Sequence, residues 1–259
     1  MEPKIRTNTV RVGNFTSSTI AAIMSNGRSK GSLGAPALTY IEECNMERRL
    51  KRSLENDSNA KPLSWGKLVE RRVFDLLGLE YKLISENTLN HPDIDYWCGS
   101  PDAQKFDEGG TVVDIKCPMT LKSFCQLVDS SYPDNAKDKD EPRYNGTVAM
   151  DIIRERHKDG EKYYWQLVSN AILINAKFAE LIVYVPYQNE LQEIRDLAQQ
   201  MDELHRYYWV ANAYDDDLPN LIEGGYYNNL NVIRFEIPQE DKDALAERVK
   251  LCGEQLVKL

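Results

Sequence analysis

The sequence contains no run of about 18 apolar residues, the shortest stretch that crosses a membrane as a helix. It also starts with Met-Glu-Pro-Lys-Ile-Arg, which lacks the apolar stretch of a secretory signal peptide. The five cysteines are odd in number and show no Cys-x-x-Cys spacing, which argues against a zinc or iron–sulfur site. We therefore expect a soluble, cytoplasmic protein with reduced thiols and no membrane partner.

Positive charge is also scarce, since 32 Lys and Arg residues face 41 Asp and Glu residues, giving a net charge of −9. This is unusual for a protein that binds nucleic acid, because affinity for a phosphate backbone comes largely from Lys and Arg. The charges are unevenly distributed. Basic pairs lie early and acidic clusters late, at Arg48-Arg49, Lys51-Arg52, Arg71-Arg72, 215–217 and 236–243. A field that is basic at a binding site and acidic behind it would remain compatible with a nucleic-acid partner.

What the chain does contain is enough apolar material for a large core. With 259 residues, 42% of them hydrophobic, it can form one large domain. We expect a single domain over 1–259, with a polar insertion at about 130–160 and a C-terminal helical and strand extension from about 189. No internal repeat is visible.

Periodicity and capping residues predict the elements in outline. Strands are expected at 111–117, 179–185 and 229–237, and helices at 35–54, 65–77, 120–128, 161–175, 189–210 and 239–259. A further helix should begin at Ile20, capped by Thr16, Ser17 or Ser18. Ser64 should cap the helix that starts at Trp65. In the helix at 35–54 the candidate inward positions are Leu38, Ile41, Leu50 and Leu54.

The chemistry gathers around the strand at 111–117. Asp114 and Lys116 interrupt this β-branched run two residues apart, so they lie on one face of the strand. The residues 107–110, Asp-Glu-Gly-Gly, are typical of a tight turn and predict a hairpin with the segment before them. The hairpin would bring Asp102, at the end of an earlier strand, close to Asp114 and Lys116.

These three residue types together indicate phosphodiester hydrolysis. Two carboxylates in a small volume repel each other unless a cation lies between them, and their hard oxygens suit Mg²⁺ or Mn²⁺. A neighbouring lysine can hold and help deprotonate a water that attacks phosphorus. The simpler alternative is that Asp102 caps a turn while Asp114 pairs with Lys116 across solvent.

The order of these motifs resembles a known family. Pro-Asp at 101–102, eleven intervening residues and Asp-x-Lys at 114–116 resemble the restriction-endonuclease-like nucleases. More narrowly, the segments 65–70, 99–103 and 114–118 are similar to the lambda-exonuclease and YqaJ-type viral recombinase nucleases. The similarity extends over about residues 10–185. The chain departs from that pattern at Ala103, where the family usually has Gly, and at Asp114, where it usually has Glu.

The resemblance implies a mixed α/β (α+β) fold, with a restriction-endonuclease-like central mixed sheet flanked by helices. It also implies a Mg²⁺-dependent, or Mn²⁺-dependent, 5′-to-3′ exonuclease acting on double-stranded DNA in phage-type recombination. Asp102, Asp114 and the backbone carbonyl of Ile115 would bind the metal, and Lys116 would position the water. Glu70 would lie in the direct or outer shell of the metal, and Gln166 near the active site. On their own, a glutamate on a helix is normally solvent-facing and a buried glutamine is a satisfied core amide.

Arg11 and Ser18 match the family residues that hold the terminal 5′-phosphate of DNA. Taken alone, this segment is better read as an ordinary helix cap beside a surface arginine, and only the resemblance gives the phosphate site equal weight. The resemblance further implies double-stranded DNA ends as substrate, a single-strand annealing protein as partner, a homotrimer, and the cytoplasm of a bacterial host. Two alternatives remain open: an endonuclease on the same scaffold, and a DNA-end-binding recombination protein with little catalytic activity.

Overall fold

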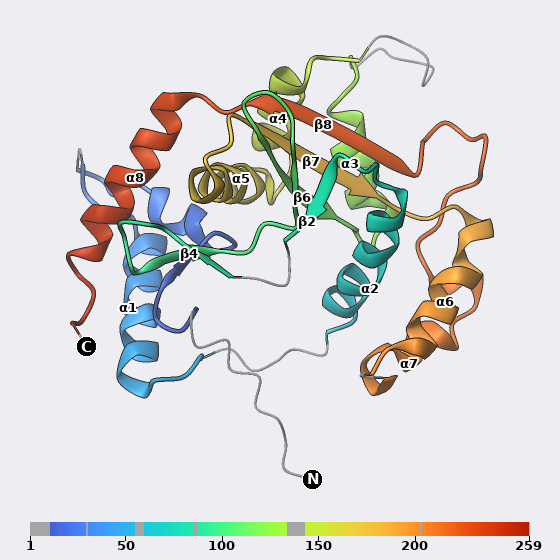
Figure 1. Cartoon of the computed structure of the whole chain (residues 1–259), viewed down its shortest axis with the longest axis horizontal. Helices are drawn as coiled ribbons and strands as arrows, with labels where there is room; N and C mark the ends of the chain where they lie inside the picture. The colour runs from blue at the N-terminus through green and yellow to red at the C-terminus, as the bar shows by residue number, and fades with distance from the viewer. Residues whose placement is uncertain are drawn as a thin grey trace.

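A mixed five-stranded sheet forms the centre of the molecule (Figure 1). The computed structural model describes residues 11–29, 31–54, 60–84, 88–133, 143–202 and 204–258. The strand order is β2 (Tyr81–Leu83), β5 (Ala103–Lys105), β6 (Thr111–Lys116), β7 (Phe178–Tyr184) and β8 (Leu230–Glu236). Only β6 and β7 pair in parallel, and the other neighbours are antiparallel. The predicted mixed sheet is thus confirmed.

The hairpin of β5 and β6 has the predicted turn. Gly110 N donates to Asp107 O at 3.0 Å, and Ala103 lies opposite Val113 in the ladder. Gly109 and Gly110 both have positive φ, at 88° and 70°, a backbone conformation that other residues adopt only with strain. The two glycines therefore permit the tight return that sets the register of β6.

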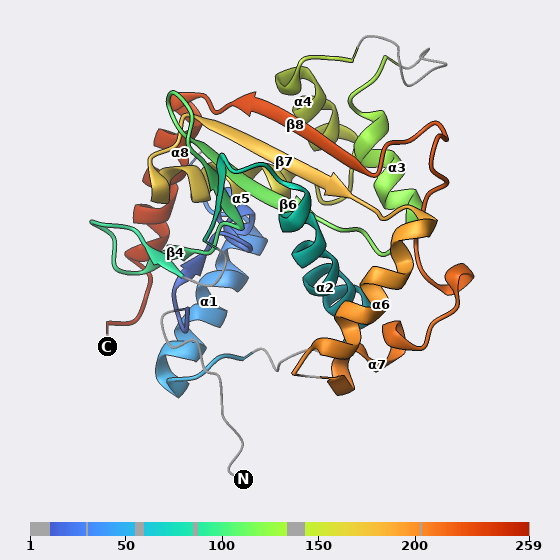
Figure 2. The same ribbon diagram turned by 45° about the vertical axis from the view of Figure 1, so that its right-hand side comes forward.

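Helices cover both faces of the sheet (Figure 2). On one face α2 (Lys61–Leu76), α6 (Leu191–Gln200) and α7 (Leu204–Ala211) contribute to a core that includes Val113 and Ile115. On the other face α5 (Gly160–Ile174) contributes to a core that includes Val112. Because both faces are covered, residues 111–115 of β6 are all buried.

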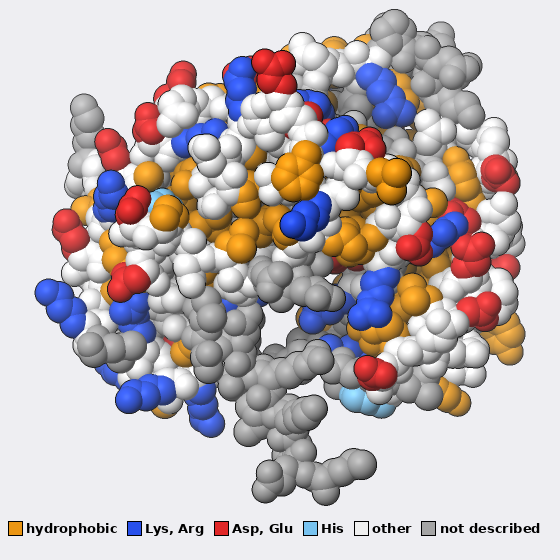
Figure 3. Space-filling view, in the orientation of Figure 1, with side chains coloured by type: hydrophobic (Ala, Val, Ile, Leu, Met, Phe, Trp, Pro, Cys, Tyr) orange, Lys and Arg blue, Asp and Glu red, His pale blue; other side chains and the backbone are white. Residues whose placement is uncertain are grey.

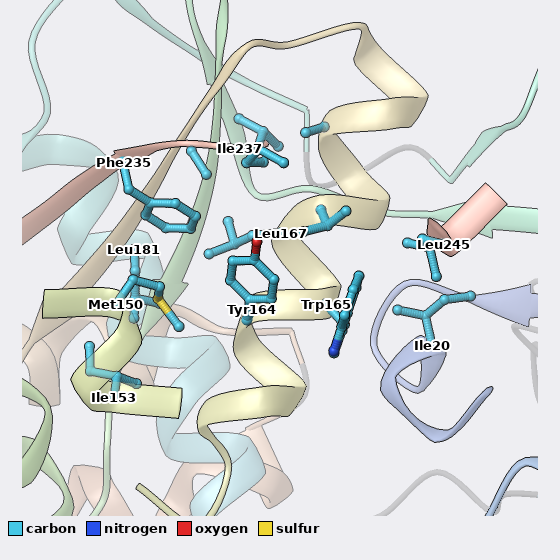
Figure 4. Close-up of a cluster of buried hydrophobic side chains, with 14 of the residues drawn as sticks. Ile20, Met150, Ile153, Tyr164, Trp165, Leu167, Leu181, Phe235, Ile237 and Leu245 are labelled. Atoms are coloured by element: carbon cyan, nitrogen blue, oxygen red, sulfur yellow. The ribbon is translucent and has the colours of Figure 1, made fainter. Parts of the chain in front are cut away.

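The larger core joins elements from both ends of the chain (Figure 4). It contains Ile20 of the 3₁₀ helix η1 (Ile20–Met24), Leu167 of α5, Leu181 of β7 and Leu245 of α8 (Gln239–Gly253). All four side chains are fully buried. The chain segments of the first and last fifth therefore share one hydrophobic core.

Part of the segment expected to be polar, at 130–160, also belongs to this core. Residues 146–156 form α4 (Gly146–Arg156), which is capped by Asn145, whose side chain accepts from Val148 N at 3.0 Å. Met150 and Ile153 are buried against the core. Residues 134–142 of the segment lie outside the described residues. Part of the segment thus forms a helix that packs on the core, because its few apolar residues recur at helical spacing.

A small second sheet was not predicted. It pairs β1 (Phe15–Thr16) in parallel with β4 (Trp97–Gly99), and β4 antiparallel with β3 (Leu89–Asn90). The helix expected from Ile20 is only a 3₁₀ turn, and its N-cap is Thr19 without a side-chain hydrogen bond. None of the predicted caps was correct, because Thr16 belongs to β1 and the Ser17 hydroxyl is hydrogen-bonded to Ser169 instead.

Two predictions about α1 (Ala35–Leu50) and α2 were wrong. In α1, Leu38, Leu50 and the following Leu54 are 49%, 51% and 42% exposed, and among the predicted positions only Ile41 is buried. The buried stripe comprises Ala37, Tyr40, Ile41 and Cys44, at the i, i+3, i+4, i+7 spacing of one helix face.

Ser64 does not cap α2. The helix starts at Lys61, with Pro62 in its first turn, and Ser64 bonds back to Lys61 O at 3.1 Å from inside the helix. Proline is favoured at this position because its missing N–H would be unpaired there in any case.

The remaining elements match the prediction closely. The helix α3 (Leu121–Asp129) is capped by Thr120, and α5, β7 and β8 lie within a few residues of their predicted bounds. The helix expected at 189–210 is divided into the 3₁₀ helix η2 (Gln188–Glu190), α6 and α7. A last 3₁₀ turn, η3, spans Asp215–Asp217.

All five cysteines are free thiols, as expected. In the described part of the chain, no helix combines the length and apolar character needed to span a membrane.

Candidate active site

The hairpin places Asp102 directly against β6. Asp102 Oδ2 accepts a hydrogen bond of 2.6 Å from Ile115 N, and Asp102 N donates to Val113 O. Asp102 therefore caps no turn of its own but bonds to the neighbouring strand between Asp114 and Lys116. The predicted proximity of these three residues is confirmed.

Asp114, Lys116 and Gln166 form a closed triangle of polar contacts. Lys116 Nζ lies 2.6 Å from Asp114 Oδ2, and Gln166 Nε2 donates to Asp114 Oδ1 at 2.7 Å. Lys116 Nζ also donates to Gln166 Oε1 at 3.4 Å. Asp114 is only 1% exposed, so its ion pair with Lys116 is buried and does not lie across solvent. Such a pair is costly to bury unless its remaining polar atoms are bonded, and Gln166 contributes one of those bonds.

Glu70 reaches the same region from α2. Burial and, after it, the negative charge of Asp114 raise the pKa of Glu70 to about 7. Burial, Asp114 and Glu70 also raise the pKa of Asp102 well above its ordinary value. The three carboxyl groups thus share one electrostatic environment, and Glu70 is partly buried, unlike a glutamate on a solvated helix face.

Lys116 keeps its charge in this environment. Burial lowers the pKa of Lys116, but the carboxylates of Asp114 and Asp102 outweigh burial and raise the pKa above its ordinary value. The ammonium also lies 5.0 Å from the centre of the Tyr163 ring, within cation–π distance. As arranged here, Lys116 is a hydrogen-bond donor rather than a free base.

The composition of this cluster fits a divalent cation. Among the described residues, no three or more His, Cys, Asp or Glu side chains are arranged around a common metal position. The donors nevertheless are carboxylates, the hard oxygen ligands that Mg²⁺ and Mn²⁺ prefer. Burial raises the pKa of both Asp102 and Glu70, and the charge of neighbouring carboxylates raises each further, so ionisation of one opposes ionisation of the other. A bound cation would remove that conflict, so the residues present suit such an ion.

Arg11 and Ser18 are also brought together. Arg11 Nη2 donates to Ser18 Oγ at 3.1 Å, and Thr16 Oγ1 lies 3.3 Å from Ser18 Oγ. Both residues are partly exposed. Next to them, Tyr40 OH accepts from Thr16 N at 2.8 Å, which fixes the segment against α1.

Helix α5 links this group to the carboxylates. Ser17 Oγ lies 2.8 Å from Ser169 Oγ, and Ser169 also accepts from Trp97 Nε1 at 2.9 Å. Ser169 is three residues after Gln166, less than one helical turn away. Through Ser17, the segment that carries Ser18 therefore contacts α5 less than one turn from the residue that binds Asp114.

The sequence interpretation missed Tyr163, Ser169 and Asn170 on this helix. Asn170 is fully buried, and its side-chain atoms have no hydrogen-bond partner among the described residues. The signal that could have revealed the set is its spacing, because Tyr163, Gln166 and Asn170 follow the i, i+3, i+7 pattern of one face in an otherwise apolar helix.

No family profile matches the sequence, and no curated protein matches it either. Solved structures do match its fold. The alkaline exonuclease LHK-Exo from Laribacter hongkongensis is 14% identical with a TM-score of 0.56, and the match covers 95% of this chain and 89% of that one. A phage-related exonuclease from Haemophilus somnus 129PT is also 14% identical, with a TM-score of 0.57 and coverage of 93% and 92%. The chain therefore has the fold of these nucleases, as its motifs predicted.

Proposed function

We propose that this protein is a metal-dependent exonuclease that degrades one strand of double-stranded DNA from its 5′ end. The single observation that carries the proposal is the buried triangle of Asp114, Lys116 and Gln166, with Asp102 bonded to the strand between them. These residues lie on a fold shared with two exonucleases over nearly the whole chain. The expected role is to produce single-stranded ends for phage-type recombination.

The proposed metal ligands are Asp102, Asp114 and the backbone carbonyl of Ile115, with Glu70 as a direct or outer ligand. When bound, Mg²⁺ or Mn²⁺ would neutralise charge on the phosphate and favour ionisation of the attacking water. The shorter side chain of Asp114, compared with the glutamate usual in the family, makes the choice between these two ions an experimental question.

The protein residues have separate tasks in this mechanism. Lys116 directs its ammonium at the attacking water and stabilises negative charge that develops on the phosphate. Gln166 uses both ends of its amide to hold Asp114 and Lys116 in a fixed relative position. Such fixed geometry lowers the entropy cost of reaching the transition state.

Arg11 and Ser18 are the proposed site for the terminal 5′-phosphate. Their side chains are already bonded to each other, and a guanidinium with a hydroxyl beside it is a common phosphate-binding pair. A site that requires a chain end would make the enzyme an exonuclease and set its 5′-to-3′ direction.

An endonuclease on the same scaffold is the main alternative, since the triangle alone would serve either reaction. The test is to incubate the protein with a linear 5′-phosphorylated duplex and with a covalently closed circle, with Mg²⁺, with Mn²⁺ and with EDTA. We expect digestion of the linear duplex to mononucleotides and single strand only when metal is present. Cutting of the closed circle at an equal rate would favour the endonuclease instead.

A DNA-end-binding protein without catalysis is the second alternative. It would bind the linear duplex and leave it intact in all three conditions. An Asp102→Asn variant serves as the matched control, because it removes the negative charge of one proposed ligand while keeping an oxygen that can accept from Ile115 N.

The assembly and the cellular context are further parts of the proposal. We propose a homotrimer, cooperation with a single-strand annealing protein, and action in the cytoplasm of a bacterial host. Light scattering of the purified protein would give its mass in solution. A monomeric mass of about 30 kDa, the mass of one chain, would contradict the trimer.

A further inference from the structure

Helix α2 presents two cations beside the catalytic carboxylates. Lys67 and Arg71 are exposed and lie one helical turn apart, so their side chains are neighbours on the helix surface. Glu70 lies on the same helix between them in sequence, and its side chain is partly buried. Leu68 and Val69, which lie between the two cations in sequence, are buried in the same hydrophobic core as Ile115 of β6. The two cations therefore border the candidate active site.

Neither cation is used in an ion pair within the described part of the chain, although the protein carries a net charge of −9. The adjacent Arg72 is different. Arg72 Nη2 lies 2.9 Å from Glu193 Oε2 and 3.5 Å from Glu190 Oε1, so it holds α2 against the η2–α6 segment. Adjacent arginines of α2 thus differ: Arg72 is held in ion pairs, and Arg71 is in none within the described residues.

The surface around α2 is rich in positive charge. Figure 3 shows Lys and Arg side chains gathered over α2. The carboxylates of the site would repel a polyanion, and unpaired cations at their edge would offset that repulsion.

We propose that Lys67 and Arg71 bind backbone phosphates of the DNA strand next to the bond that is cut. This inference rests on the proposed nuclease function and adds a second phosphate-binding site to it, distinct from the terminal site at Arg11 and Ser18. The ligand is the phosphodiester backbone, which both side chains contact without reading the base sequence. The contacts offset the repulsion between the substrate and the carboxylates of the site.

The test measures the salt dependence of DNA binding. Full-length protein is titrated with a fluorescent linear duplex over a series of KCl concentrations. Ca²⁺ replaces Mg²⁺ in the buffer, so that binding is measured without digestion of the DNA. Variants are Lys67→Gln, Arg71→Gln and the double variant, and Arg72→Gln is the matched control. Thermal melting of each variant shows whether the fold is retained.

Each lost phosphate contact should reduce the slope of log affinity against log salt by roughly 0.7 to 0.9. We therefore expect a reduction of about that size for each single variant and about twice as much for the double variant. Arg72→Gln should keep the wild-type slope and melt at a lower temperature, because it breaks an ion pair between α2 and α6.

Two results would overturn the inference while leaving the nuclease proposal intact. One is a folded double variant with the wild-type slope. The other is an equal loss of slope in Arg72→Gln, which would show a general charge effect. If the wild-type protein neither binds nor degrades the duplex, the proposed function and this inference both fail.

Discussion

Gln166 on α5 donates a hydrogen bond of 2.7 Å from its Nε2 to Oδ1 of Asp114 on β6. The other end of the same amide, Oε1, accepts from Lys116 Nζ. A primary amide offers a donor and an acceptor on one rigid planar group. The helix therefore fixes the relative position of the two strand residues that we place at the reacting phosphate.

Gln166→Leu should lower the rate of digestion by about 10- to 100-fold, on the order of 1.4–2.8 kcal/mol of transition-state stabilisation. The reason is that Asp114 and Lys116 lose the group that aligns them, while the remaining fold is unchanged. Single-turnover digestion of a 5′-phosphorylated duplex measures the effect, and duplex binding in Ca²⁺ checks that the substrate still binds. A variant that cuts at the wild-type rate would reduce Gln166 to a core amide.

Lys116→Ala should reduce the single-turnover rate by about 10² to 10⁴, the usual range for one positioned acid–base group. Removing the ammonium leaves Asp102 and Asp114 with less compensating charge, so the variant should bind Mg²⁺ at least as tightly as the wild type. Calorimetry measures the metal affinity. Lys82→Ala on β2 is the control, because Lys82 is exposed and lies at the edge of the sheet. Rapid cutting by a folded Lys116→Ala protein would remove Lys116 from the mechanism.

Arg11→Ala should slow digestion chiefly of duplexes that carry a 5′-phosphate. A guanidinium on a terminal phosphate makes a charge-assisted contact of about 1.5–3 kcal/mol, which corresponds to roughly 10- to 150-fold. Paired time courses on 5′-phosphate and 5′-hydroxyl ends measure the ratio, and the exposed Arg28→Ala is the control. If both kinds of end lose the same fraction of rate, Arg11 is a general backbone contact.

Tyr163→Leu should lower the single-turnover rate by roughly 5- to 30-fold, which corresponds to about 1–2 kcal/mol for a desolvated cation–π contact. The ring of Tyr163 lies against the ammonium of Lys116 and restricts where it points. Tyr163→Phe keeps the aromatic face and should restore most of the rate. Equal losses in Phe and Leu variants would instead assign the effect to the hydroxyl group.

The residues of the triangle were predictable to different degrees. Asp102, Asp114 and Lys116 lie on one hairpin, whose turn and alternation are local features of the sequence, so their proximity follows from period and turn residues. Gln166 and Glu70 reach the site from separate helices. Their approach depends on tertiary packing, so only the family resemblance indicated it.

The errors have the same physical origin. The exposed Leu38 and Leu50 of α1 are apolar, but the face that packs is fixed by its neighbours in the fold and contains Ala37, Tyr40 and Cys44. The contact between Ser17 and Ser169 joins residues 152 positions apart. A local capping rule cannot anticipate such a partner, and it assigned the hydroxyl of Ser17 to a helix that it does not cap.

His157 gives the protein a pH-dependent contact near the site. Its ring stacks on Tyr163 with the ring centres 5.6 Å apart, and it is 5% exposed. Asp159 N donates to His157 Nδ1 at 3.2 Å, so Nδ1 acts as an acceptor and the ring is neutral, with Nε2 as donor to Ser123 Oγ at 3.1 Å. Burial lowers the pKa of His157, although Asp159 opposes this effect.

The sign of the dependence follows from these contacts. Below the ordinary histidine pKa of about 6.5 the unfolded chain binds a proton that the folded protein binds less readily, so the free energy of unfolding falls as the pH falls. We expect the melting temperature to decrease between about pH 7 and pH 5, and His157→Gln to weaken this decrease. Thermal melting across this range measures it. The exposed His205→Gln serves as the control and should keep the wild-type slope. If His157→Gln and the wild type lose stability in parallel, protonation of His157 does not govern the acid sensitivity of this region.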